Sequence, residues 1–103
     1  MSLASREKKS LRQIAHHLDV VVTIGDQGIS QGVINETERA LQDHELIKVR
    51  VAAGERADRN AAAVDLANLC AAEIVQQIGK VVILYRANPK ADPRLSNIAR
   101  YQQ

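Results

Sequence analysis

Aromatic residues are nearly missing from this sequence, which holds two tyrosines but no phenylalanine and no tryptophan. Proteins that read single-stranded nucleic acid by stacking need exposed aromatic rings, so a stacking platform is nearly excluded here. The core must then come from Val, Ile, Leu and Ala. With 46% hydrophobic and 25% charged residues in a chain of 103, the composition indicates one globular domain.

Cysteine and long apolar runs are also scarce. Cys70 is the only cysteine, which rules out a disulfide scaffold and favours a reducing compartment. The longest apolar runs, such as residues 81–85, are far shorter than the ~20 residues that span a bilayer. The first residues lack the apolar segment of a secretory signal. We therefore expect a cytoplasmic protein that does not enter a membrane.

Catalytic and cofactor motifs are missing as well. There is neither a GxxxxGK[ST] loop nor a GxGxxG fingerprint, so nucleotide hydrolysis and dinucleotide binding lack their basic parts. The adjacent His16 and His17 point in different directions on a helix, which disfavours metal chelation. His44 and Glu45 could form an acid–base pair, although a helix-terminal imidazole beside a turn carboxylate is the simpler interpretation. We expect no enzyme activity, no cofactor, no metal and no small-molecule substrate.

Hydrophobic periodicity and turn signals predict a single α/β domain over residues 1–86. The predicted order is α-β-α-β-α-β-β, with helices near 5–17, 30–43 and 58–72 and strands at 20–24, 46–51, 74–78 and 81–85. The strand at 20–24 is rich in β-branched residues and is expected in the sheet interior, covered on at least one face. Core candidates on the third helix are Leu66, Leu69 and Cys70, the cysteine as a small buried hydrophobe.

Local signals also mark helix starts and the C-terminal segment. Ser5, Ser30 and Asp58 are candidate N-caps, because their side chains can accept a hydrogen bond from a free backbone N–H. Two prolines and mixed charge predict a mobile tail over residues 87–103, with a short helical piece near 95–101.

Charge is unevenly distributed, although the net charge is only +2. Residues 1–18 carry four basic side chains and one acidic one, whereas residues 31–47 carry one basic and four acidic. Such an uneven distribution of charge can steer an anionic partner toward one side of a small protein. Lys8, Lys9 and Arg12 on the first helix then form either a solvated outer face or a ridge that meets phosphates.

A short glycine loop, Gly25-Asp26-Gln27-Gly28, joins the first strand to the second helix. Glycine lets another backbone approach closely, and the free N–H groups at a helix start, here after Ser30, attract anions. The loop is therefore a candidate phosphate site. Alternatively, the glycines only close a tight connection between strand and helix.

The second strand adds basic side chains to this picture. Strict alternation puts Ile47, Val49 and Val51 on one face of the strand. Lys48 and Arg50 then lie on the opposite face, which predicts a sheet with one buried and one basic open face. If the register of the last two strands follows the same alternation, Gln77 and Arg86 extend the open face.

Three blocks of this sequence together resemble the YhbY-type CRM domain, the RNA-binding module of chloroplast splicing factors and bacterial ribosome-maturation proteins. These blocks are Ala15-His16, Val22-x-Ile24-Gly25-x-x-Gly28-Ile29 and Ala40-Leu41-x-x-His44-Glu45-Leu46-Ile47-Lys48-Val49. The resemblance covers roughly residues 5–86, and residues 44–49 are its most specific part.

The resemblance implies a fold similar to the C-terminal domain of translation initiation factor 3, with a four-stranded mixed sheet and packed helices. It also implies a non-enzymatic factor that binds RNA of large ribosomal subunit precursors. The residues that would contact RNA are Gly25, Asp26, Gln27, Gly28, Ser30, Lys8, Lys9, Arg12, Lys48, Arg50 and Arg86.

One residue departs from the family pattern. Family members often place a basic or neutral residue in the glycine loop, where this chain has the acidic Asp26. Without the resemblance, the residues support only an anion-binding α/β module. A domain for small phosphate ligands, or a protein-interaction adaptor that uses the acidic second helix or the tail, then remains an alternative.

Overall fold

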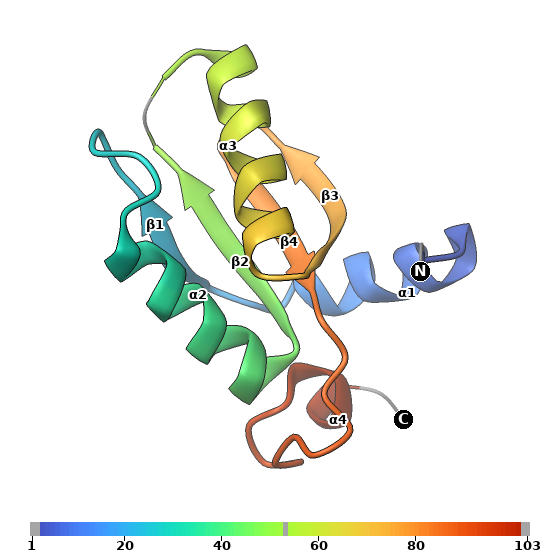
Figure 1. Cartoon of the computed structure of the whole chain (residues 1–103). Coiled ribbons are helices and arrows are strands. Elements are labelled where there is room, and N and C mark those ends of the chain that lie inside the picture. Colours follow the sequence, from blue (N-terminus) through green and yellow to red (C-terminus); the bar gives the residue numbers. More distant parts are fainter. Residues whose placement is uncertain (1–2, 53, 102–103) are drawn as a thin grey trace.

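The computed structural model describes residues 3–52 and 54–101 (Figure 1). Its elements are α1 (Ser5–Ala15), β1 (Val20–Ile24), α2 (Gln31–His44), β2 (Leu46–Val51), α3 (Arg56–Leu69), β3 (Glu73–Ile78), β4 (Val81–Tyr85) and α4 (Asn97–Tyr101). This order confirms the predicted arrangement, and α4 lies inside the segment where a short helix was expected. Within the described residues, no helix is both long and apolar enough to cross a membrane.

The four strands form one mixed sheet in the order β1-β2-β4-β3, as the fold class predicts. β1 pairs with β2 in parallel, whereas β2 with β4 and β4 with β3 are antiparallel. The prediction that β1 lies in the sheet interior is wrong, because β1 is an edge strand and Val21 is 48% exposed. Its β-branched run reflects burial of Val22 and Ile24 against one layer of helices only.

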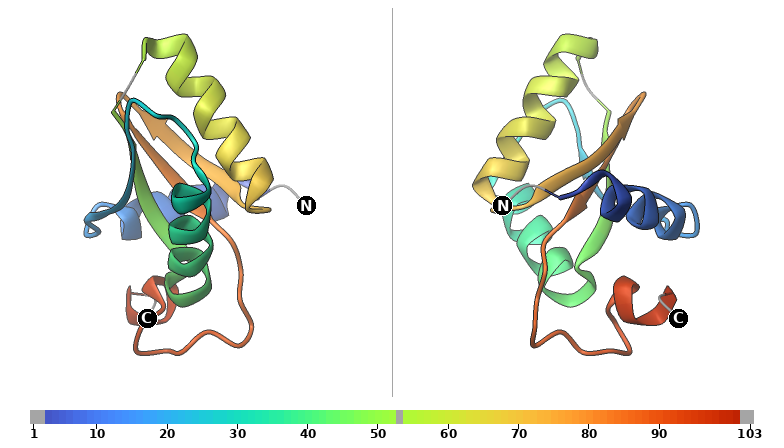
Figure 2. Two further views of the ribbon diagram at one scale, coloured as in Figure 1. Left: turned by 60° about the vertical axis from the view of Figure 1, so that its left-hand side comes forward. Right: turned by 90° about the vertical axis from the view of Figure 1, so that its right-hand side faces the viewer.

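Helices cover both faces of the sheet, with α2 and α3 on one side and α1 and α4 on the other (Figure 2). The larger core lies beneath α2 and α3 and contains Val22, Ile24, Leu41, Ile47, Val49, Val51, Ala63, Leu66, Ala67, Cys70, Val82 and Leu84. The smaller core lies beneath α1 and contains Leu11, Ile14, Ala15, Leu46, Val75 and Ile83. The start of β2 is therefore buried on both faces. The face predicted to be open is covered at Leu46 and becomes accessible only from Lys48 onward.

Of the three predicted helix starts, that of α2 is confirmed, whereas those of α1 and α3 differ from the prediction. Ser30 caps α2 as predicted, since its hydroxyl oxygen accepts the Val33 N–H at 3.2 Å. The residue before α1 is Ala4 rather than Ser5, and the Glu7 carboxylate accepts the Ala4 N–H at 3.3 Å. A carboxylate in the first turn thus satisfies the helix start in place of a serine.

The third helix begins and ends earlier than the predicted range of residues 58–72, because it spans Arg56–Leu69. Glu55 is its N-cap, and Asp58 in the first turn accepts the Glu55 N–H at 3.2 Å. The helix ends at Leu69, since Ala71 adopts a left-handed φ of 52° that breaks the helical path. Leu69 is 58% exposed, so its assignment to the core was wrong.

The C-terminal segment, predicted to be a mobile tail, packs against the domain as far as residue 101. The Glu45 carboxylate accepts the Asn88 N–H at 2.7 Å and also the Ser96 hydroxyl. The Asn97 side chain donates to the Leu46 carbonyl at 2.6 Å, and Ser96 is only 1% exposed. These contacts join residues about fifty positions apart in the chain, so local composition does not reveal them.

Candidate functional site

The glycine loop is a tight turn with open space beside both glycines. The Gly28 N–H donates to the Gly25 carbonyl at 3.0 Å, and Gly28 has a φ of 71° that favours glycine. A Cβ added at either position would meet no atom within 4 Å. Close packing therefore does not explain Gly25, and the backbone of the loop is accessible to a ligand.

The turn leads directly into α2, whose first residues present free backbone N–H groups. Gly32 in the first turn has no side chain to cover them. At the tip of the turn, Asp26 and Gln27 are both exposed. Among the described residues, the Asp26 carboxylate accepts no hydrogen bond, so it does not cap a local N–H. The carboxylate is therefore exposed to solvent at the tip of the turn, where it would repel an anion bound at the loop.

The sheet register brings Arg50 beside this loop. Arg50 pairs with Thr23 of β1 on one side and with Val81 of β4 on the other. Two residues further on, the Ala52 N–H donates to the Ile24 carbonyl at 2.9 Å, which ties the end of β2 to the start of the loop. A basic side chain from β2 and the glycine turn therefore lie at the same end of the sheet.

Helix α1 contributes a second group of basic side chains to the same face. Lys8, Arg12 and His16 follow one another at a spacing of four residues and share one flank of α1. Arg12 and His16 line a cavity of about 190 Å³ together with Lys48. The structure thus brings Arg12 and Lys48 together, as predicted, while Lys9 is exposed further round the helix.

The basic face, defined as Arg12, Lys48 and Arg50, is available to an anion. The ion pairs in the described chain are Arg86 with Glu38 and Arg94 with Asp92, and neither involves this face. The three side chains also form no hydrogen bond with another described residue. The charges of the basic face are therefore not neutralised within the described part of the chain.

Arg86 lies on the other side of the sheet from the basic face, contrary to the expectation that it would extend it. Its Nη1 donates to the Glu38 carboxylate at 2.9 Å and to the Cys70 carbonyl at 2.8 Å. Ile83 and Tyr85 of the preceding strand pack toward α1, so alternation sends the next side chain toward α2 and α3. Arg86 joins these two helices and is removed from the proposed contacts.

Replacing Arg86 with methionine should lower the free energy of unfolding by about 1–2 kcal/mol. The Cys70 carbonyl loses its charged donor, but Glu38 is 46% exposed and regains water, which limits the cost. Denaturation in urea would measure the change. We expect Glu38→Gln to be less destabilising than Arg86→Met, because the hydrogen bond from Arg86 to the Cys70 carbonyl survives in it. Equal losses of stability in the two variants would show that the ion pair alone accounts for the effect.

A bulge in β3 exchanges the roles of two neighbouring glutamines. The pairing with β4 shifts between Ile74 and Gln76, so that Gln76 lies opposite Ile83 and Gln77 opposite Val82. Ile83 faces α1 and Val82 faces the larger core. Gln76, not Gln77, therefore lines the cavity beside the basic face. Unbroken alternation cannot reveal a bulge, which is why the sequence pattern missed Gln76.

The residues considered for catalysis have structural partners. Burial first, and then the nearby Glu38 charge, raise the pKa of the Cys70 thiol, which keeps it protonated. His44 Nδ1 donates to the Leu95 carbonyl at 2.8 Å, while the Glu45 carboxylate holds the C-terminal segment. His44 and Glu45 thus bind residues 88–96, consistent with the simpler interpretation of the pair. No cluster of three metal-binding side chains occurs in the described residues.

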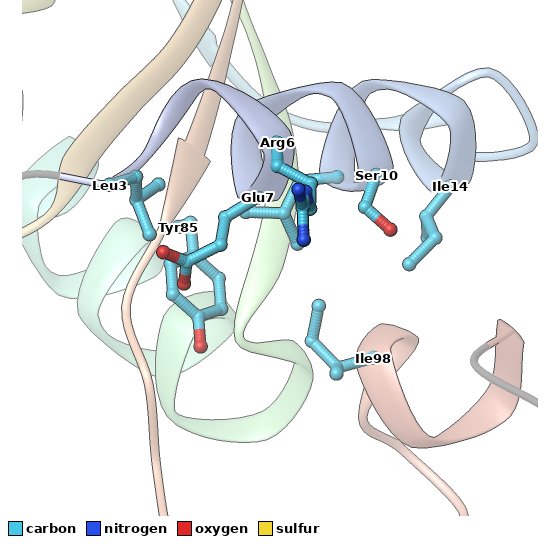
Figure 3. Close-up of a pocket in the computed structure, with 8 residues that line it drawn as sticks. Leu3, Arg6, Glu7, Ser10, Ile14, Tyr85 and Ile98 are labelled. Carbon is cyan, nitrogen blue, oxygen red and sulfur yellow. The ribbon is translucent and has the colours of Figure 1, made fainter.

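A second cavity, of about 300 Å³, lies on the opposite flank of α1, toward α4 (Figure 3). Figure 3 shows Glu7 and Tyr85 close together on one wall and Ile98 across from α1. Burial, followed by the charges of Glu45 and Glu7, raises the pKa of Tyr85. Arg6 and Glu7 bring charges of both signs to this second cavity, so it suits an anion less well than the basic face does.

Comparison with known proteins agrees with this architecture. The CRS1 / YhbY (CRM) domain family matches residues 3–86. A probable RNA-binding protein of Pseudomonas aeruginosa is 46% identical over 101 residues, which cover 98% of this chain and 97% of the relative. An RNA-binding protein of Haemophilus influenzae is 38% identical over 94 residues, covering 91% and 95% of the two chains.

A solved structure has the same fold. The solution structure of a Staphylococcus aureus protein, a candidate RNA-binding protein, superimposes with a TM-score of 0.77 at 32% identity. The match covers 88% of this chain and 95% of the other. The shared fold, the family match over residues 3–86 and the near full-length relatives lead to one assignment: this chain belongs to the CRS1 / YhbY (CRM) domain family.

Proposed function

We propose that this protein is a non-enzymatic RNA-binding factor that holds the RNA backbone with the loop at residues 25–28 and the basic face. The observation that carries the proposal is the position of Arg50, which pairs with Thr23, two residues before the loop. Lys48 and Arg12 continue the same face away from the loop. The names of the relatives, as RNA-binding proteins, support the same function.

The chemistry of this surface favours phosphate contacts over stacking. Its charged side chains and free backbone N–H groups can bind phosphate oxygens, whereas the chain has only two aromatic rings outside histidine. Phosphate contacts release counterions and carry little sequence information, so we expect strong salt dependence and modest sequence preference. The RNA would be recognised mainly through its shape and backbone.

We further propose that the RNA belongs to precursors of the large ribosomal subunit and that the protein acts in the cytoplasm during ribosome assembly. The resemblance of residues 15–49 to ribosome-maturation proteins of the family supports this role. Sedimentation of a cell lysate at low salt tests it, with detection of the protein across free, precursor and mature subunit fractions. We expect it with the large-subunit precursors. Occurrence only in the fractions without ribosomal particles would contradict the ribosomal role.

Replacing Asp26 with lysine should tighten RNA binding severalfold at low salt. The carboxylate at the tip of the turn repels phosphate, and a lysine there would add an attractive charge at the same position. Fluorescence anisotropy with a labelled structured RNA would measure the dissociation constant. Asp19→Lys, an equal charge change outside the loop, is the control. An unchanged dissociation constant for Asp26→Lys would show that the loop does not contact RNA.

A further inference from the structure

The cavity between α1 and the sheet combines apolar walls with a polar rim. Its volume is about 190 Å³. The walls are aliphatic and consist of Ala15, Ile78, Val81 and Ile83. The rim is polar and consists of Arg12, His16, Lys48 and Gln76. The cavity therefore offers a surface for a flat apolar group, surrounded by hydrogen-bonding and cationic side chains.

The polar groups of this rim have no partner within the part of the chain that the structure describes. No hydrogen bond or ion pair joins the side chains of Arg12, His16, Lys48 or Gln76 to another described residue. Gln76 is half-buried, yet its amide keeps both a donor and an acceptor available. None of these side chains is fully buried, so solvent satisfies their polar groups and a ligand with complementary groups can replace that solvent.

The size and chemistry of the cavity suit one nucleobase. It is smaller than the roughly 300–1,000 Å³ of pockets that enclose drug-sized ligands, so it admits a single ring system. Aliphatic side chains can cover the faces of a base, and a glutamine amide can bind its edge. Arg12 and Lys48 line the same cavity, so their charges can bind the phosphates on either side of that base.

We infer that this cavity receives one unstacked base of a single-stranded RNA segment and that Gln76 hydrogen-bonds to the edge of the base. The inference rests on the proposed RNA-binding function and adds a position at which the protein distinguishes bases. Arg50 connects the two parts of the site, because it pairs with Val81 of the cavity wall and with Thr23 before the glycine loop. The RNA backbone would follow β2 from the cavity to the loop.

The test compares single-stranded RNA homopolymers of U, A and C with an abasic ribose-phosphate oligomer, all of equal length. The wild-type protein should bind one homopolymer about tenfold more tightly than the others, and the abasic oligomer most weakly. In Gln76→Leu this preference should fall by about tenfold, the equivalent of ~1.4 kcal/mol, while the salt dependence stays the same. Gln77→Leu is the matched control, because Gln77 faces the other side of the sheet; it should keep the preference.

Two results would overturn the inference, and they are distinguishable. If the abasic oligomer binds as tightly as the homopolymers, or if Gln76→Leu keeps the full preference, no base enters the cavity, although salt-dependent binding would still support the proposed function. If the wild-type protein shows no salt-dependent binding to any of these RNAs or to a structured RNA, the proposed function fails together with the inference.

Discussion

Replacing Lys48 and Arg50 together with glutamine should weaken RNA binding by between roughly 25-fold and 60-fold in 0.1 M salt. Each phosphate contact contributes about 0.7–0.9 to the slope of log affinity against log salt, which corresponds to about 5–8-fold per contact at this salt concentration. The magnitude of the slope should fall by about 1.4–1.8 for the pair. Titrations of a labelled RNA at several salt concentrations measure both quantities.

A charge-matched variant separates local contacts from net charge. Lys90→Gln with Arg94→Gln removes the same two charges from the C-terminal segment, which lies at the other end of the molecule from the glycine loop (Figure 1). This control should keep nearly the full salt slope. Equal losses in the two double variants would assign the effect to net charge, and an unchanged slope in the Lys48 and Arg50 variant would remove the basic face from the RNA site.

Glu45→Ala should release the C-terminal segment and lower the free energy of unfolding by about 3 kcal/mol. Its carboxylate accepts the Asn88 N–H and the Ser96 hydroxyl, and hydrogen bonds to a charged group contribute about 1.5–3 kcal/mol each. Ser96 is buried, so its hydroxyl would lose its acceptor in a place that water reaches poorly. Denaturation in urea measures the stability change.

Hydrogen exchange locates the effect of this substitution. The amides of Ile98, Ala99 and Arg100 should lose protection in Glu45→Ala, while the amides of β2 and β4 keep theirs. Glu45→Gly is a second variant that removes the carboxylate without straining the backbone, because glycine readily adopts the φ of 64° found at Glu45. If Glu45→Gly kept the wild-type protection at residues 98–100, the carboxylate would not be what holds the segment.

Local patterns in the sequence are sufficient to predict most of the elements and one face of the sheet. β2 shows why: its alternation separates Val49 from Lys48 and Arg50, and the structure confirms that division. The start of α2 is equally local, since Ser30 bonds to an N–H only three residues away. Periodicity and capping depend on neighbours within a turn or a strand, so they can be recognised without knowledge of the fold.

Side-chain direction at the ends and irregularities of strands depends on the whole sheet. Because of a single bulged residue in β3, Gln76 rather than Gln77 lies beside the basic face. Arg86 follows a strand whose register against β2 determines that it faces α2 and α3. An error of one residue in register reverses the face, and no local signal in these strands specifies the register.

The order of helices and strands, the position of the glycine loop and the basic character of β2 could therefore be predicted from the amino-acid sequence. Three features became visible only in the folded chain: Arg12 and Lys48 share a cavity with Gln76, Arg86 is absent from the basic face, and Glu45 holds the C-terminal segment. The first group of features arises from interactions between near neighbours in the chain. The second arises from contacts between distant segments, whose partners are chosen by the register of the sheet and the packing of helices on it.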